Sequence, residues 1–189
     1  MTTPSSSATV APASSPDPAE PGRQGFMKQN MELDFINRSP LGRPFSVVAR
    51  SFGPVRVGRV LGTPSSFIRA RQHLADGRDL LTLVISGGGR FRVEGVRGHD
   101  GYGGHGAAVL ESRRESVLHS LDDSRAWTIC IDRAPLEPLL AGLHGPLQRC
   151  IQGDNAGLRL LDGYLAALFG LERDCDAALA SRHIGDLVL

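Results

Sequence analysis

The sequence predicts an α+β fold in which a β-barrel or jelly roll precedes a helical segment. Two observations support this prediction. Between residues 45 and 131, short apolar runs with strand-like alternation are separated by turns that are rich in glycine. After Ile131 the apolar residues are spaced three and four apart, as in amphipathic helices. Strands that precede helices along the chain indicate α+β rather than a parallel βαβ sheet.

The first part of the chain, residues 1–26, is expected to be a disordered tail. It is rich in Ser, Pro, Thr and Ala and shows no apolar periodicity. Such a segment cannot bury enough surface to offset its ordering entropy. Met27 and Met31 leave open that part of the tail is an upstream extension. We expect the β-rich part to span residues 27–133 and the helical part to span residues 134–189.

Eight segments carry strand patterns. The clearest are residues 55–60, which alternate strictly, and residues 79–85, an apolar run between turn residues. The full set comprises residues 45–49, 55–60, 66–71, 79–85, 91–96, 107–111, 116–119 and 126–131. Glycines 87–89 follow one strand but lead into another, so we interpret them as a turn and not as a phosphate loop.

Three helices are expected after the strands. The first begins near Pro135 and ends at the glycines of residues 142–145. The second is capped at residues 154–155 and runs to about Phe169. The third, residues 174–189, ends on Leu-Val-Leu without glycine, proline or a basic last turn. This uncapped end suggests a sensing or docking module that is cut before the part it controls.

Composition excludes several classes of protein. With 21 basic and 20 acidic residues the formal net charge is +1, so no overall field attracts nucleic acid or an anionic membrane. Cys130, Cys150 and Cys175 form no C-x-x-C pair, which argues against a structural zinc site or a redox motif. Without a signal peptide or a membrane-length apolar run, we expect a soluble, cytoplasmic protein.

Four strings in the sequence resemble motifs of the N-terminal regulatory domain of AraC/XylS-type transcription activators. They are residues 71–85, residues 104–110, residues 131–140, and residues 160–168 together with 183–189. They occur in the order of the family and cover roughly residues 35–189. Two features depart from the family pattern: Asp132 replaces the usual proline, and residues 101–106 are unusually rich in glycine.

The resemblance implies a cupin-like barrel that binds a small effector, followed by helices that mediate dimerisation. On this hypothesis the chain is the effector-sensing and dimerising domain of an AraC-type regulator, without cofactor or enzymatic activity. DNA contact would require a helix-turn-helix domain beyond residue 189, because the helical half shows no basic face. Two alternatives remain: a stand-alone, metal-dependent cupin-like enzyme, and a gene fragment without activity.

A metal site would need converging histidines and carboxylates. The candidates are His99, Asp100, His105, Glu111 and His119. The first and third of these lie six residues apart in a glycine-rich stretch, which does not match the H-x-H spacing of cupin enzymes. We therefore interpret them as solvent-exposed loop histidines. His119 could face the barrel interior, where a hydrogen-bonded core histidine is the preferred interpretation, and no metal site or catalytic site is predicted.

The second expected helix carries a stripe of four leucines, the candidate dimer-interface residues Leu158, Leu161, Leu165 and Leu168. The stripe has two interpretations: it packs on the barrel, or it faces a second copy of the chain in a symmetric dimer. The family resemblance favours dimerisation. His183 and Asp186 lie three apart on the last helix, for which we expect a structural role. The sequence identifies neither the effector nor the residues of its pocket.

Overall fold

The computed structural model describes residues 30, 32–39, 45–95, 101–141, 146–153, 155–171 and 175–188. The strands are β1 (Asp34–Asn37), β2 (Ser46–Phe52), β3 (Val55–Gly62), β4 (Ser65–Arg69), β5 (Leu80–Gly88), β6 (Arg90–Glu94), β7 (Gly101–Gly103), β8 (Ala107–Glu111), β9 (Ser116–Ser120), β10 (Ser124–Asp132) and β11 (Arg149–Ile151). The helices are the 3₁₀ helices η1 (Arg71–Asp76) and η2 (Ala134–Leu136), and the α-helices α2 (Glu137–Leu140), α3 (Ala156–Gly170) and α4 (Ala177–Val188). The expected tail of residues 1–26 lies outside the described residues.

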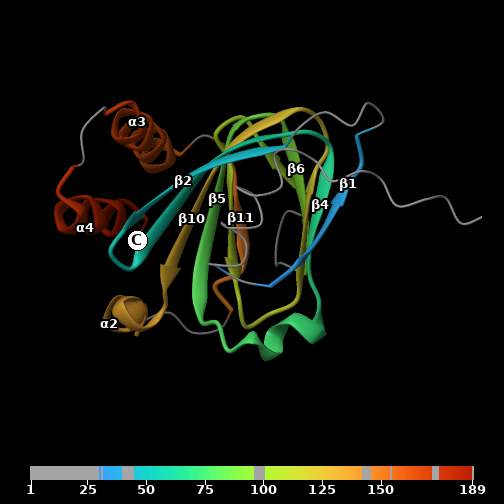
Figure 1. Cartoon of the computed structure of the whole chain (residues 1–189), viewed down its shortest axis with the longest axis horizontal. Coiled ribbons are helices and arrows are strands. Elements are labelled where there is room, and N and C mark those ends of the chain that lie inside the picture. Colours follow the sequence, from blue (N-terminus) through green and yellow to red (C-terminus); the bar gives the residue numbers. More distant parts are fainter. Residues whose placement is uncertain are drawn as a thin grey trace, which may run out of the picture.

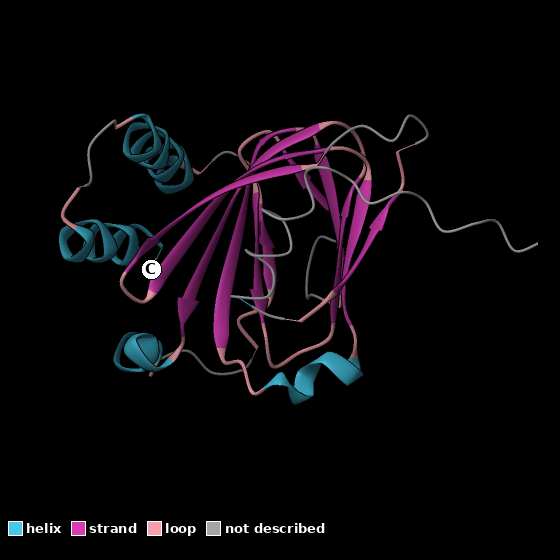
Figure 2. Cartoon of the chain, viewed as in Figure 1, coloured by secondary structure: helices cyan, strands magenta, loops and turns pink. Residues whose placement is uncertain are grey.

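The strands form two antiparallel sheets that face each other. The five-stranded sheet has the order β1-β4-β9-β6-β7, and the six-stranded sheet has the order β11-β8-β5-β10-β3-β2. The helices α2, α3 and α4 lie beside the six-stranded sheet, on the side away from the five-stranded sheet (Figures 1 and 2). None of the helices in the described part of the chain has the length and apolar character needed to cross a bilayer. The α+β prediction is therefore confirmed.

The six-stranded sheet is covered on both faces, which explains the mostly apolar character of its central strands. Every residue from 80 to 86 in β5 is buried. Side chains alternate between the two faces of a strand. Leu83 in β5 and Ile129 in β10 belong to the core that the sheet shares with the helices. Their neighbours Val84 and Thr128 instead face the five-stranded sheet and line a cavity.

Helix α3 has hydrogen-bonding side chains at both ends, and the one at its C-terminal end joins it to the six-stranded sheet. The expected N-cap is confirmed at Asn155, whose Oδ1 accepts a hydrogen bond from the backbone N–H of Leu158 at 3.1 Å. At the other end, the Arg50 guanidinium of β2 donates to the carbonyl oxygens of Leu168 and Leu171 at 2.7 and 3.2 Å. A cation at this position satisfies terminal carbonyls and interacts favourably with the helix dipole.

The predicted strand segments agree with the structure, with small shifts at their ends. The turn interpretation of glycines 87–89 is correct only for Gly89, which joins β5 to β6 with φ of +89°. Gly87 and Gly88 instead belong to β5. The sequence does not predict β1, β7 and β11, because these strands have only three or four residues and so show no periodicity. The first helix is shorter than expected: a 3₁₀ turn is followed by the four residues of α2, and Pro138 lacks the N–H that would continue the helical hydrogen bonds between them.

Candidate ligand-binding cavity

A cavity of about 100 Å³ lies between the two sheets. The six-stranded sheet contributes Val84 and Thr128 to its wall, and the five-stranded sheet contributes Phe67 and Leu118. Because the two faces alternate along each strand, these inward side chains come from every second residue. The wall is mostly apolar and contains a few polar groups, as is usual for small-molecule sites.

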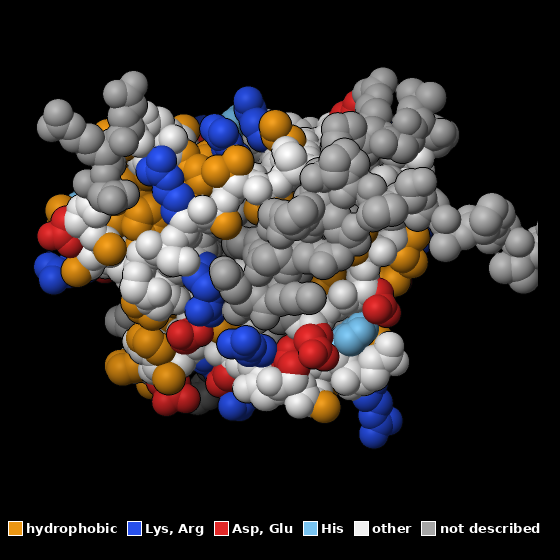
Figure 3. Space-filling model, viewed as in Figure 1, with side chains coloured by type: hydrophobic (Ala, Val, Ile, Leu, Met, Phe, Trp, Pro, Cys, Tyr) orange, Lys and Arg blue, Asp and Glu red, His pale blue; other side chains and the backbone are white. Residues whose placement is uncertain are grey.

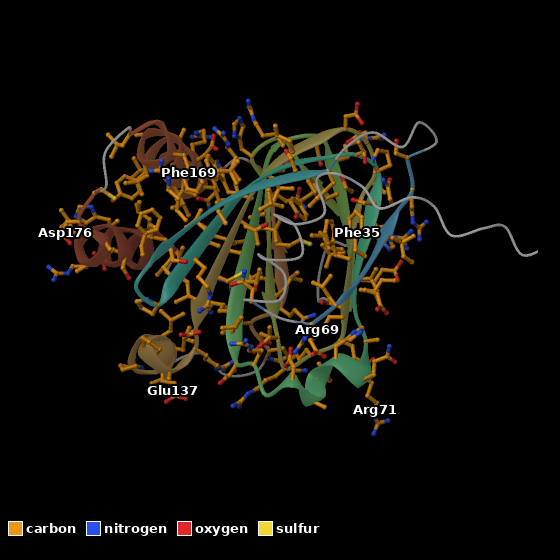
Figure 4. The ribbon with its side chains drawn as sticks, viewed as in Figure 1. Phe35, Arg69, Arg71, Glu137, Phe169 and Asp176 are labelled. Atoms are coloured by element: carbon orange, nitrogen blue, oxygen red, sulfur yellow. The ribbon has the colours of Figure 1, made fainter. Side chains whose placement is uncertain are left out.

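One side of the cavity is closed by three phenylalanines. Phe35 of β1, Phe67 of β4 and Phe45, which precedes β2, contact one another with ring centroids 5.2 to 5.5 Å apart and tilted planes. This arrangement is the favourable tilted geometry of aromatic pairs. Phe45 is only 2% exposed and, with Phe67, lines the cavity. Figure 4 shows that Phe35 lies on the side away from Phe169, the labelled residue of α3.

One end of the cavity contains a buried ion pair. Arg69 lines the cavity and donates from Nη1 and Nη2 to the two carboxylate oxygens of Asp76 at 2.8 and 2.9 Å. The side chains are 3% and 6% exposed. Arg69 also donates to the carbonyl oxygens of Ser112 and Glu32 at 2.8 and 2.6 Å. The hydrogen bonds that Asp76 accepts, chiefly from Arg69 and also from the backbone N–H groups of Glu32 and Arg78, hold the pKa of Asp76 well below its usual range.

A second carboxylate at this end is equally well satisfied. Glu111 of β8 accepts hydrogen bonds from Arg133 at 2.7 Å and from the backbone N–H of Leu147 at 3.0 Å. Arg114 lies 3.2 Å from its other oxygen. Each charged side chain that lines the cavity therefore has an oppositely charged partner within the chain. Both carboxylate oxygens of Glu111 are engaged by donors of the protein.

Several hydroxyl groups and one thiol complete the wall. Ser120 Oγ lies 2.9 Å from Ser124 Oγ, and Thr82 Oγ1 donates to Cys130 Sγ at 3.7 Å. Burial raises the pKa of the Cys130 thiol to about 11, so that thiol stays protonated at neutral pH. Ser65 differs from these groups: it is fully buried and lines the cavity, and its Oγ has no hydrogen-bond partner among the described residues.

The wall of the cavity is connected to α3 through β10. Trp127 lies between Ala126 and Thr128, which both line the cavity, and points to the opposite face of the sheet. Its Nε1 donates to Asp162 Oδ1 of α3 at 2.6 Å. The indole ring also packs edge-on against Phe169 at 4.8 Å between centroids. A shift of β10 caused by a ligand in the cavity would therefore change the contacts that Trp127 makes with α3.

The structure does not bring the candidate metal ligands together. His105 lies near Asp162, with Nδ1 and Oδ2 3.7 Å apart, and Glu111 is engaged by arginines. The inner-face placement considered for His119 is wrong: it alternates with the cavity-lining Leu118, and its ring contacts Ser66 Oγ at 2.8 Å on the outer face of the sheet. His99 and Asp100 lie outside the described residues. Within the described ranges no group of three histidine, cysteine or acidic residues is placed to hold a metal ion.

The leucine stripe packs inside the chain. Leu158, Leu161, Leu165 and Leu168 are 6%, 0%, 0% and 6% exposed and belong to the core between α3 and the six-stranded sheet. The packing interpretation of the stripe therefore describes the structure, and its role in a dimer stays a prediction. His183 has a structural contact, since its Nδ1 lies 3.1 Å from the Tyr164 hydroxyl and joins α4 to α3. Asp186 is exposed.

Comparison with known proteins places the chain by its fold. No family model matches the sequence, and no curated protein matches it. Among solved structures, the chain is similar to the AraC-like transcriptional activator CuxR, with a TM-score of 0.72 at 15% sequence identity. The likeness covers 90% of this chain and 65% of the solved chain, so this chain spans less than two thirds of that structure. The resemblance seen in the sequence strings is thus confirmed as a shared fold: the chain is folded like an AraC-like transcriptional activator.

Proposed function

We propose that the chain is the effector-sensing and dimerising domain of an AraC-type transcription regulator, with a cupin-like jelly-roll barrel as its sensor. The observation that carries the proposal is that one sheet forms both the wall of the cavity and the surface on which the helices pack. The six-stranded sheet lines the cavity with one face and packs against α3 and α4 with the other. The fold shared with an AraC-like activator supports the same assignment.

The proposed mechanism is linkage between the cavity and the helices. A ligand that binds one arrangement of the six-stranded sheet better than another shifts the population toward that arrangement. Trp127 and Asp162 transmit the shift, because their 2.6 Å hydrogen bond joins β10 to α3. The helices then present a different surface to whatever they contact. Such coupling needs only a few kcal/mol of differential affinity.

Dimerisation is the second part of the proposal. The four leucines of the stripe hold α3 on the sheet, so a second copy of the chain would contact the outer side of the helices. Leu160 of α3 is 61% exposed and Leu179 of α4 is 48% exposed. The space-filling view shows hydrophobic side chains at the surface on the side where the helices lie (Figure 3). Contact with DNA is proposed to depend on a helix-turn-helix unit, which the described residues do not contain.

A ligand screen tests the sensing role. Aromatic acids, sugars, fatty acids and small neutral aromatic compounds would be added to the full chain, and the melting temperature would be measured. We expect at least one class to raise it. The variant Ala126→Ile should abolish the rise, because Ala126 lines the cavity and a larger side chain would occupy it. Specific operator binding by this chain alone, or stoichiometric Fe, Mn or Zn that is lost in His105→Ala, would contradict the proposal.

Light scattering after size exclusion tests the dimer. We expect the wild-type chain to be dimeric at micromolar concentration and Leu160→Glu to be monomeric and folded. Ala166→Glu is the matched control, because the 100° step of a helix places Leu160 and Ala166 on opposite flanks of the buried stripe. Equal dissociation by both variants, or a monomeric wild-type chain, would contradict the proposed interface.

A further inference from the structure

We propose that the cavity between the sheets binds a compact, neutral and largely apolar molecule that carries one hydroxyl or carbonyl oxygen, and that Ser65 is its hydrogen-bonding partner. This inference rests on the proposed function and specifies the ligand class of the same cavity. Three properties of the wall carry it: the balance of its charges, the unpartnered hydroxyl of Ser65, and its apolar lining.

The charges of the wall disfavour an ionised ligand. Arg69 is the cation among the described residues that line the cavity, and Asp76 already occupies it with two short hydrogen bonds. An anionic ligand would have to compete with Asp76 for Arg69 and would leave an excess negative charge in a buried site. Glu111 is likewise neutralised by Arg133 and Arg114, so a cationic ligand gains no unpaired carboxylate. Burying an uncompensated charge is strongly unfavourable.

Ser65 provides the specific polar contact. Ser65 is 0% exposed and lines the cavity, and its Oγ has no hydrogen-bond partner among the described residues. Its cross-strand neighbour Ser120 is engaged with Ser124. A buried hydroxyl without a hydrogen-bond partner lowers the stability of the folded chain. A ligand oxygen that bonds to Ser65 removes this free-energy cost on binding. A ligand without such a group leaves the cost in place.

The remaining wall sets the size and character of the ligand. Phe45, Phe67 and Val84 present apolar surface to the cavity, and Phe91 and Leu118 extend it. An apolar cavity of roughly 150 Å³ accepts benzene. The volume of about 100 Å³ in this chain therefore suits a molecule of one ring or less, with small rotations of the lining side chains. Polyols and long acyl chains do not fit this combination of size and polarity.

Calorimetric titration of the full chain with phenol, toluene and benzoate tests the inference. Phenol and toluene have similar shapes and differ in the hydroxyl group, and benzoate adds a negative charge. We expect phenol and toluene to bind and phenol to bind at least about tenfold more tightly than benzoate. Ser65→Ala should weaken phenol about fivefold and change toluene by less than about twofold. The variant removes an unpartnered hydroxyl, so it should keep or raise the melting temperature.

Ser66→Ala is the matched control, because Ser66 is equally buried but bonds to His119 on the outer face of the same strand. It should leave the affinity for phenol unchanged. The inference is overturned if benzoate binds more tightly than phenol, or if Ser65→Ala weakens phenol and toluene equally. Binding of a charged or polyhydroxylated compound that Ala126→Ile abolishes would overturn the inference and leave the sensing proposal standing. Failure of every class of compound to bind would overturn both.

Discussion

The two faces of the six-stranded sheet are built from alternate residues of the same strands, yet they differ in kind. The face toward the helices carries large apolar side chains: Val55, Val57, Leu81, Leu83, Ile85, Trp127, Ile129 and Ile131. In the two central strands, β5 and β10, the face toward the cavity carries smaller or polar side chains: Thr82, Val84, Ala126, Thr128 and Cys130. Large side chains fill the helix side, and small ones leave space on the other side. Burial alone therefore does not distinguish a residue that holds the fold from one that shapes a ligand site.

The largest expected effect is at the charged end of the cavity, where Arg69 of the five-stranded sheet pairs with Asp76. Asp76→Asn removes the charge that neutralises the buried Arg69, and loss of one partner of a buried ion pair costs about 3–5 kcal/mol. Urea unfolding at neutral pH measures this free energy. If the cost is that large, part of the cavity wall stabilises the fold as strongly as the helix face of the six-stranded sheet does.

Asp79→Asn is the control, because Asp79 pairs at 3.0 Å with the exposed Arg113 and should cost less than about 1 kcal/mol. The pH dependence provides a second check. The pKa of Asp76 is lower in the folded chain than in the unfolded chain, so its contribution is present above about pH 4 and is lost as pH falls below that value. The Asn variant should lose this part of the acid sensitivity. Equal costs for the two variants would contradict the prediction.

The next effect compares the two faces directly. Ile129→Ala opens a hole in the core under the helices, where Ile129 is 0% exposed, and should cost about 2–5 kcal/mol. Its neighbour Thr128 borders the cavity, so Thr128→Ser should cost less than about 1 kcal/mol. Urea unfolding of both variants measures the difference. A similar cost for the two would show that the faces do not differ in the way described.

A smaller effect is expected at the junction of the helix face and α3. Arg50→Met removes two hydrogen bonds to the end of α3 and the contact of the guanidinium with the Phe169 ring at 5.3 Å. We expect a loss of about 1–2 kcal/mol and faster hydrogen exchange in α3. Arg59→Met, at an exposed position of β3, should change stability by less than about 0.5 kcal/mol. Unchanged exchange in α3 would contradict the role given to Arg50.

The sequence predicted the order of the elements well because strand and helix periods are local properties. Residues 55–60 and 79–85 were identified as strands from alternation and from apolar character alone. The site was not predictable in the same way. Ser65, Phe67 and Arg69 share one face of β4, but nothing local shows that this face is the inner one. The partner of Arg69, Asp76, lies in a 3₁₀ helix that the sequence did not indicate.

The leucine stripe and His119 show the same limit. The period of α3 identified a buried face correctly, but periodicity does not tell whether that face meets the same chain or a second copy. The strand that contains His119 is predicted correctly, but the sequence does not show to which face of the sheet the side chain points. A strand has two equivalent faces until its neighbours are known. Cross-strand register decided the direction of His119, and the packing of α3 on the six-stranded sheet decided what the leucine stripe contacts. Both depend on contacts between residues that are distant in the sequence.

The chain contains one tryptophan, so its indole N–H gives a single signal in an NMR spectrum. That group bonds to Asp162 on α3 and lies directly behind the cavity wall. Titration with phenol, followed by this signal, tests the claim that the sheet links the cavity to the helices. We expect the signal to shift with the same affinity that calorimetry gives and to stay fixed in Ala126→Ile. Saturating binding with an unmoved indole signal would contradict the account.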